Sequence, residues 1–168
     1  MQGFRCRVLL ACLSVAILSC QPARRAENEA VSEEAFERIM GQLAHGWSTQ
    51  NTDEALSVFA PDAIYMEPPE EQLFVGHDQL REYFGALKPG TVMTWHGLWF
   101  DEHRQVGAGE FTFGSAGADL ATHGAVIVEL RQGRIAVWRE YLRSGPADRN
   151  RFLGTEDKKW RWTIENYP

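Results

Sequence analysis

Four strand-like segments follow one another in the second half of the chain and limit the folds open to it. They read TVMTWHGLWF, QVGAGEFTFG, THGAVIVELR and RIAVWREYLR, between residues 91 and 143, and are rich in β-branched and aromatic residues. Only the turn residues of RQGR separate the last two segments, a spacing that predicts a β-hairpin. Strands joined by such short connections pair antiparallel, so we expect an antiparallel sheet.

The first half of the chain carries helical periodicity instead. Apolar side chains recur at three- and four-residue spacing after Ser32, which fits an N-cap position. We expect a second, short helix over residues 51–60, ended by Pro61, and a third in the segment 76–90, with Pro89 and Gly90 as its stop. A short strand, AIYMEPP, lies between them at residues 63–69. This order predicts an α+β fold, with three N-terminal helices packed on one face of a curved, mostly antiparallel sheet.

Composition excludes several function classes. The chain has 168 residues, which suits one domain, and a net charge of −6. No stretch concentrates lysine and arginine enough to bind a phosphate backbone, so we expect no nucleic-acid partner. The sequence contains no Gly-rich phosphate loop, no nucleophile elbow and no zinc-motif spacing, so neither a cofactor nor a metal is expected.

The N-terminal sequence has the pattern of a secretory signal peptide. A basic start, MQGFRCR, precedes an apolar run of twelve residues, shorter than the roughly 20 that span a bilayer. The run ends in ILSC, which resembles the lipobox of bacterial lipoproteins. We therefore expect a signal peptide over residues 1–19, lipidation of Cys20, a flexible tether over 20–31 and one domain over 32–168. The alternative is an ordinary cleaved signal with an incidental cysteine.

Two further expectations concern the ends of the mature chain. Gln21 follows the cysteine, which resembles lipoproteins of the outer membrane, so the expected location is the bacterial cell envelope, at the periplasmic face of that membrane. The membrane is then contacted through the lipid anchor only. Near the C-terminus, Trp160, Trp162 and Ile164 alternate with polar residues, which predicts a strand or an extended segment that covers an edge.

Three local motifs resemble the nuclear transport factor 2-like superfamily, and its SnoaL-like branch in particular. They are FAPDAIYMEPP, GHDQLREYF and GRIAVWREYL, and together with the element order they cover roughly residues 32–142. The resemblance implies a sheet curled into a cone with an apolar pocket for a small molecule. It also implies a homodimer formed through the open sheet. The superfamily includes isomerases, cyclases, epoxide hydrolases, dehydratases and binding proteins, so the fold does not decide the activity.

The resemblance also selects candidate catalytic residues. Glu67 stands where ketosteroid isomerases carry their Asp general base, just before a proline. Tyr65 and Glu67 are similar to the Tyr-x-Asn pair that positions water in limonene epoxide hydrolases. Glu140, in WREYL, matches the Asp of the WRDYF motif of that family.

Neither catalytic set is complete. The hydrolases have Arg-x-Asp on a middle strand, where this chain has Glu110 and Thr112. The isomerases have a Tyr and a protonated Asp as an oxyanion hole, at positions that correspond to Leu43 and Val126. Neither activity is therefore inherited from the resemblance alone.

Strand parity gathers the same residues into an acidic pocket. Side chains alternate along a strand, so Tyr65 shares a face with Glu67, and Trp138 shares one with Glu140. Carboxylates that converge in an apolar cone raise one another's pKa, as a general base near neutral pH requires. The alternative is that these glutamates are solvated or paired with arginines. The expected set comprises Glu67 and Glu140 as candidate catalytic groups, with Tyr65, Glu110, Thr112, Trp138 and His96 as ligand contacts.

Three functions remain open at this level. The first is a lipid-anchored envelope protein whose cone binds a small, largely apolar molecule. The second is an acid–base enzyme, an isomerase, a polyketide-cyclase-like or an epoxide-hydrolase-like protein, with Glu67 as general base. The third is a dimeric interaction module without catalysis.

Overall fold

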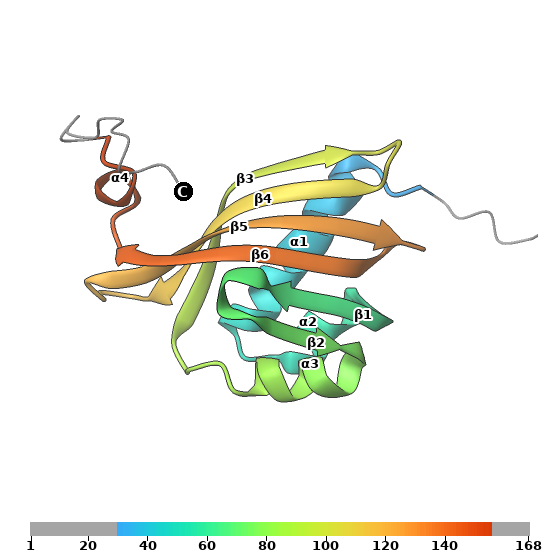
Figure 1. Ribbon diagram of the computed structural model, residues 1–168, viewed down its shortest axis with the longest axis horizontal. Coiled ribbons are helices and arrows are strands. Elements are labelled where there is room, and N and C mark those ends of the chain that lie inside the picture. Colours follow the sequence, from blue (N-terminus) through green and yellow to red (C-terminus); the bar gives the residue numbers. More distant parts are fainter. Residues whose placement is uncertain (1–29, 156–168) are drawn as a thin grey trace, which may run out of the picture.

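One six-stranded sheet organises the computed structural model, which describes residues 30–155 (Figure 1). The strand order is β2-β1-β6-β5-β4-β3, and neighbours pair antiparallel except β1 and β6, which run parallel. The expected α+β fold with a curved, mostly antiparallel sheet is confirmed. The strands are β1 (Phe59–Glu67), β2 (Gln72–Val75), β3 (Thr91–Asp101), β4 (Val106–Ser115), β5 (Leu120–Arg131) and β6 (Arg134–Pro146).

The three N-terminal helices pack on the sheet, as expected. Helix α1 packs against β3 and against α2, and α3 packs against β1 (Figure 1). A fourth, short helix follows β6 and contacts that strand. The helices are α1 (Glu33–Ser48), α2 (Thr52–Ser57), α3 (Gly76–Gly85) and α4 (Arg149–Phe152), and a 3-10 turn, η1, covers Pro68–Glu70.

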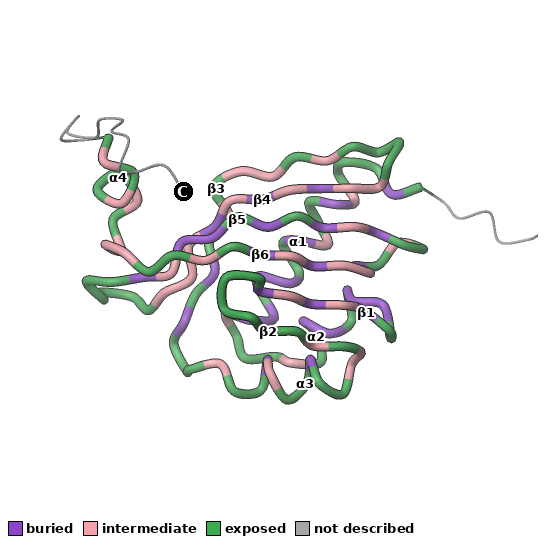
Figure 2. The backbone as a smooth tube through the Cα atoms, in the orientation of Figure 1, coloured by how far each residue is buried: buried purple, intermediate pink, exposed green. Residues whose placement is uncertain are grey.

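Local sequence explains where α1 begins and which face it buries. The side chain of Ser32 caps the helix by accepting a hydrogen bond from the backbone N–H of Ala35 at 3.2 Å. Phe36, Met40 and Leu43 then recur on one face and are fully buried in the core. Each such side chain stabilises the fold by about 1.5–3 kcal/mol through the apolar surface removed from water. Along the strands, buried positions are interspersed with less buried ones, as the colours of Figure 2 show.

Two backbone features shape the sheet. Gln132 and Gly133 both have positive φ, 53° and 74°, so the β5–β6 connection is the tight hairpin expected from RQGR. In β3 the ladder skips His96, because Trp95 pairs with Phe111 and Gly97 pairs with Glu110, the residue next to Phe111. This bulge bends the strand and changes which of its residues face the helices.

Several predicted boundaries in the first half of the chain are wrong. Helix α2 ends at Ser57 rather than at residue 60, and β1 begins at Phe59, so Pro61 lies inside a strand. The β1–β6 ladder is irregular between Phe59 and Ile64, so no regular ladder position demands the N–H group that proline lacks. Helix α3 ends at Gly85, before the predicted stop at Pro89 and Gly90. Strand β2 was not predicted, because its four residues are too short for a clear pattern.

Residues 1–29 and 156–168 lie outside the described structure. The predicted signal peptide, Cys20, most of the tether and the alternating segment at residues 160–164 therefore fall there. Among residues 30–155, no helix combines the length and the apolar character that crossing a bilayer requires.

Candidate functional site

A cavity of about 200 Å³ lies between the inner face of the sheet and helices α1 and α3. Among residues 30–155, the groups that form its walls are mostly aromatic or aliphatic, and Glu140 is the one carboxylate that lines it. Helices and strands supply every lining residue except Leu87, so loops contribute little to the cavity wall. The lining residues are Trp47 from α1, Tyr83 and Phe84 from α3, Leu87 after α3, and Tyr65, Phe111, Phe113, Thr122, Glu140 and Leu142 from the strands.

Glu140 is held by neutral donors. Its side chain is 3% exposed, and Tyr65 donates its hydroxyl to Oε1 at 2.5 Å. Trp138 donates its indole N–H to Oε2 at 2.9 Å. Within the described residues, no arginine, lysine or histidine forms an ion pair with Glu140. The pairing with arginine that the sequence left open is therefore absent from this part of the chain.

Burial without a cationic partner changes the acidity of Glu140. Loss of solvent, together with a smaller contribution from the nearby negative charge of Glu67, raises its pKa to about 8. The hydrogen bonds from Tyr65 and Trp138 act in the opposite direction, because they stabilise the charged form, but they are outweighed. Glu140 therefore holds its proton at neutral pH, inside an apolar cavity.

Glu67 lies beside the cavity but does not line it. It is the last residue of β1 and is 2% exposed, and the hydroxyl of Tyr83 donates a hydrogen bond to its Oε1. Tyr83 itself lines the cavity, so Glu67 reaches the cavity through this phenol. The 3-10 turn of Pro68 and Pro69 follows at once and fixes the direction in which the chain leaves the strand.

The two tyrosine–carboxylate pairs stand next to each other. The rings of Tyr65 and Tyr83 meet edge to face with centroids 5.4 Å apart. Burial raises the pKa of both phenols, and the neighbouring carboxylates add to the effect. Both tyrosines therefore stay neutral and serve as donors.

Trp138 supports the site from behind. It is fully buried, stacks on Tyr65 with ring centroids 5.8 Å apart, and does not line the cavity. Strand pairing explains this contact, because Tyr65 of β1 lies directly opposite Trp138 of β6. Trp138, which was expected as a ligand contact, thus orients Glu140 through its hydrogen bond instead.

The other expected ligand contacts lie outside the cavity. Phe111 and Phe113 of β4 line it, so the alternate residues Glu110 and Thr112 face the opposite side of the sheet. Glu110 there forms a two-pronged ion pair with Arg149 of α4, with N–O distances of 2.8–3.0 Å. Contrary to the expected arrangement, these groups do not share a pocket with Glu140.

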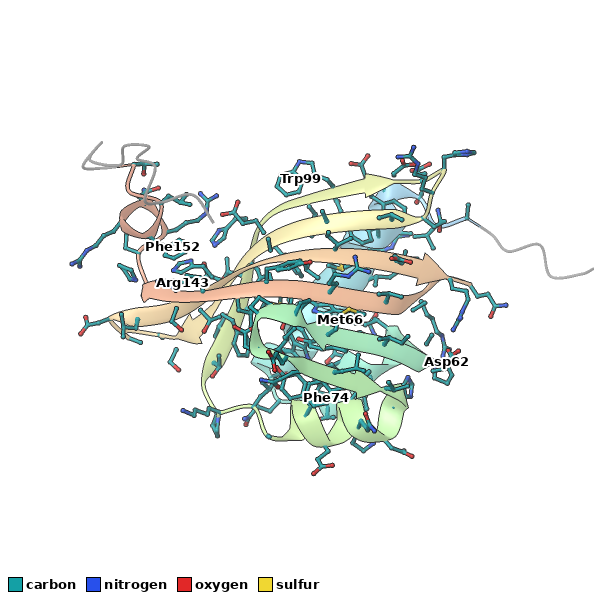
Figure 3. All side chains as sticks on the ribbon, in the orientation of Figure 1. Asp62, Met66, Phe74, Trp99, Arg143 and Phe152 are labelled. Carbon is teal, nitrogen blue, oxygen red and sulfur yellow. The ribbon has the colours of Figure 1, made fainter. Side chains whose placement is uncertain are left out.

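A chain of polar contacts occupies this outer face. Nε2 of His96 lies 2.7 Å from the hydroxyl of Thr112, which lies 3.0 Å from Nδ1 of His123. The ring of Phe152, which is labelled in Figure 3, stacks on His123 with centroids 3.8 Å apart. Partial burial and the charge of Arg149 lower the pKa of His96. His96, expected as a ligand contact, therefore belongs to the surface on which α4 packs.

Of the residues that line the cavity, only Tyr65 and Glu140 were singled out from the sequence. Tyr83 and Trp47 fit the apolar stripes of their helices and were interpreted only as core positions. Their polar atoms were the available signal, since a tyrosine or tryptophan on a buried stripe needs a hydrogen-bond partner. Among residues 30–155, no group of three or more histidine, cysteine, aspartate or glutamate side chains could hold a metal ion.

Comparison with known proteins gives one family match. Residues 41–138 match the model of a family described as SnoaL-like domain. No curated protein matches the chain.

Solved structures give fold-level neighbours. A protein of unknown function with a cystatin-like fold from Methylobium petroleophilum PM1 is 20% identical, with a TM-score of 0.61 over 83% of this chain and 99% of that one. A protein proposed to be a ketosteroid isomerase, from Kribbella flavida DSM 17836, is 16% identical, with a TM-score of 0.59 over 79% and 93%. An LEH-like epoxide hydrolase from M. tuberculosis is 14% identical, with a TM-score of 0.55 over 66% of this chain and 84% of that one. At these identities the likeness shows the fold.

Proposed function

Because the chain belongs to the SnoaL-like domain family, within the nuclear transport factor 2-like superfamily, we propose that its cone binds a small, largely apolar molecule. The observation that carries the proposal is the cavity of about 200 Å³, with aromatic walls and a single carboxylate, Glu140. Ligand pockets for drug-sized molecules usually measure about 300–1,000 Å³. This cavity is smaller, so we expect a ligand smaller than those.

Binding is tested with a hydrocarbon probe. Methylenecyclohexane is titrated into the ¹⁵N-labelled protein, and the shifted resonances are expected to cluster at cavity residues. Leu142→Trp fills the cavity and should abolish these shifts. Ile127→Trp adds the same bulk on the outer face and should preserve them. If wild type shows no saturable shifts, or if Leu142→Trp binds as well as Ile127→Trp, the proposal fails.

An acid–base enzyme is the second candidate. Glu140 favours it, because a carboxylic acid with a pKa of about 8 beside an apolar cavity can donate a proton to a substrate oxygen at neutral pH. Glu140 then contacts the substrate, and Glu67, expected from the sequence as the base, acts through Tyr83. Opening of a small epoxide and isomerisation of an unsaturated ketone are the reactions to assay, because fold neighbours are described as an epoxide hydrolase and an isomerase.

The two glutamates distinguish direct from indirect catalysis. General acid–base groups contribute about 10²- to 10⁴-fold to a rate. If the protein turns over either substrate, Glu140→Gln should lower the rate by about that factor. Glu67→Gln should lower the rate less and should shift the pH profile of the rate. An unchanged rate in Glu140→Gln rejects the catalytic assignment of Glu140.

A lipid anchor at the N-terminus belongs to the same proposal. The ILSC sequence after a short apolar run supports lipidation of Cys20 and attachment to the periplasmic face of the outer membrane. Labelled fatty acid should then be incorporated into the wild-type chain in bacteria and not into Cys20→Ala. Equal labelling of both chains, or none, rejects the anchor.

A homodimer through the sheet is a further part of the proposal. Its support is the outer face, where Trp99, Ile127 and Tyr141 are exposed (Figure 3 labels Trp99). Ile127→Glu should then shift the sedimentation coefficient of the protein from dimer to monomer. If the wild-type protein is monomeric, the homodimer is rejected, and so is the function as a dimeric interaction module.

A further inference from the structure

A second hollow, which we call the vestibule, adjoins the cavity. Its walls come from the segment that links α3 to β3, from the β4–β5 hairpin and from β6, and its volume is about 460 Å³. Leu87, Phe113 and Thr122 line both the vestibule and the cavity. The vestibule therefore lies at the mouth of the cavity, and a molecule that is longer than the cavity would extend into it.

Strand β6 gives the direction in which the two spaces follow each other. Glu140 and Leu142 line the cavity, and Ser144, two residues further along the same face, lines the vestibule. At about 3.4 Å per residue, Glu140 and Ser144 are about 14 Å apart along the strand. The combined space is therefore elongated, with Glu140 towards its inner end and Ser144 at its outer end.

The polar groups at the inner end are paired with one another. Tyr65 donates its hydroxyl to Glu140, and Tyr83 donates its own to Glu67. Glu140 also forms a hydrogen bond with Glu67, so the proton of Glu140 has an acceptor within the protein. The indole N–H of Trp47 has almost no exposed surface, so a ligand does not reach it. A polar group that entered this end would lose its hydrogen bonds with water and find no partner.

The outer end offers partners to a polar group instead. Thr122 is partly exposed where the cavity meets the vestibule, and its hydroxyl can donate and accept a hydrogen bond. Ser144 lies directly opposite Thr122 in the β5–β6 ladder. Ser144 and Lys88, which also line the vestibule, are exposed, so water reaches this space.

This difference between the two ends selects a class of ligand and its orientation. We propose that the cavity and the vestibule form one site for a single-headed amphiphile, an apolar chain that carries one polar group such as a hydroxyl. The chain fills the cavity, and the head group lies in the vestibule beside Thr122. This inference rests on the proposed binding function and names its ligand class.

The rival arrangement directs the polar group inward. The acid–base function requires that arrangement, because a substrate oxygen must then reach Glu140. Orientation of the bound molecule therefore distinguishes the two arrangements.

A matched pair of probes tests the inner end. The compounds 1-octanol and 1,8-octanediol have the same length and differ in a second terminal hydroxyl group. Binding of each is followed by titration into the ¹⁵N-labelled protein. We expect the wild-type protein to bind the diol roughly 10-fold more weakly or worse, because its second hydroxyl leaves water without gaining a partner.

A matched pair of variants tests the outer end. Thr122→Val removes the hydroxyl at the mouth and keeps the shape of the side chain, and it should bind 1-octanol roughly 3- to 10-fold more weakly. Thr94→Val makes the same change at an exposed position of β3 that lines neither space, and it should bind 1-octanol as wild type does.

Intermolecular NOEs in wild type give the orientation without any variant. The terminal methyl group of 1-octanol should contact the ring of Tyr65, and its CH₂OH group should contact the methyl group of Thr122. Reversed contacts, equal affinities for 1-octanol and the diol, or an unchanged affinity in Thr122→Val would overturn the inference. Binding of methylenecyclohexane without binding of 1-octanol would also overturn it. If neither of these two probes binds, the binding function on which the inference rests is rejected instead.

Discussion

The two faces of the sheet hold glutamates with opposite acidity. Glu140 on the inner face is buried among aromatic rings, and loss of solvent raises its pKa to about 8. Glu110 on the outer face accepts hydrogen bonds from the guanidinium of Arg149, which lower its pKa below the ordinary value. The residue type is the same in both places. The face of the strand and the charge of the donor decide which glutamate keeps its proton.

The donors explain why only the inner face suits acid–base chemistry. A phenol and an indole donate hydrogen bonds to Glu140 without bringing positive charge, so the proton stays bound. A guanidinium forms an ion pair with Glu110 and favours its charged form, and the pair is partly open to solvent. An ionised glutamate bound to an arginine has no proton to give at neutral pH.

The largest expected effect comes from Glu140→Gln. Since the folded pKa of Glu140 is raised, its contribution to stability is present below the ordinary glutamate pKa and is lost as pH rises toward about 8. The free energy of unfolding of wild type should therefore fall by about 1.4 kcal/mol per pH unit in this window. Urea unfolding between pH 5 and 9 should show that the variant lacks this slope.

A matched control keeps the interpretation of that slope specific. Glu110→Gln makes the same chemical change on the outer face and should leave the slope between pH 5 and 8 intact. Equal slopes in wild type and Glu140→Gln would mean that Glu140 does not hold its proton in the folded state.

Tyr65→Phe should have the next largest effect. It removes the donor to Oε1 of Glu140 and leaves that buried oxygen unpaired, at a cost of about 1–3 kcal/mol. The pKa of Glu140 should also rise, because this hydrogen bond favours the charged form. Carboxyl ¹³C NMR of the variant checks the shift, and a lowered pKa would contradict the assigned direction of the hydrogen bond.

Glu67→Gln should act on the neighbouring Glu140, whose pKa Glu67 raises through its charge and through a hydrogen bond. The negative charge of Glu67 raises the pKa of Glu140, so its removal should lower that pKa from about 8. A carboxyl ¹³C titration measures this change. Glu129→Gln, which removes a partly exposed charge on the outer face, serves as the control and should leave the titration unmoved. If Glu140 titrates at the same pH in Glu67→Gln as in wild type, the two tyrosine–carboxylate pairs do not interact electrostatically.

Glu110→Gln should have the smallest effect on stability. Because its folded pKa is lowered, its contribution is present above the ordinary glutamate pKa and is lost as pH falls through the folded value. A small decrease in the urea midpoint at pH 7 should therefore vanish near pH 3, and it should shrink in 1 M salt, since the pair is partly exposed. A large decrease in the free energy of unfolding at pH 7 would contradict this prediction and would show that the contact between α4 and the sheet is important for folding.

Sequence by itself determined what depends on neighbours along the chain. The cap at Ser32, the buried stripe of α1 and the hairpin at residues 131–134 are local, because backbone geometry and side-chain periodicity set them within a few residues. The grouping of Tyr65 with Glu67, and of Trp138 with Glu140, follows from the alternation along a single strand in the same way.

Tertiary structure alone decided what these groups face. Tyr65 meets Glu140 across 75 residues of sequence because β1 pairs in parallel with β6, and no periodicity predicts a partner at that distance. The outward direction of Glu110 depends on the side from which the helices cover the sheet, since alternation fixes which residues share a face and not which face is buried. The physical reason is that burial and partner charge, which set acidity, are properties of the packed molecule and not of any one segment.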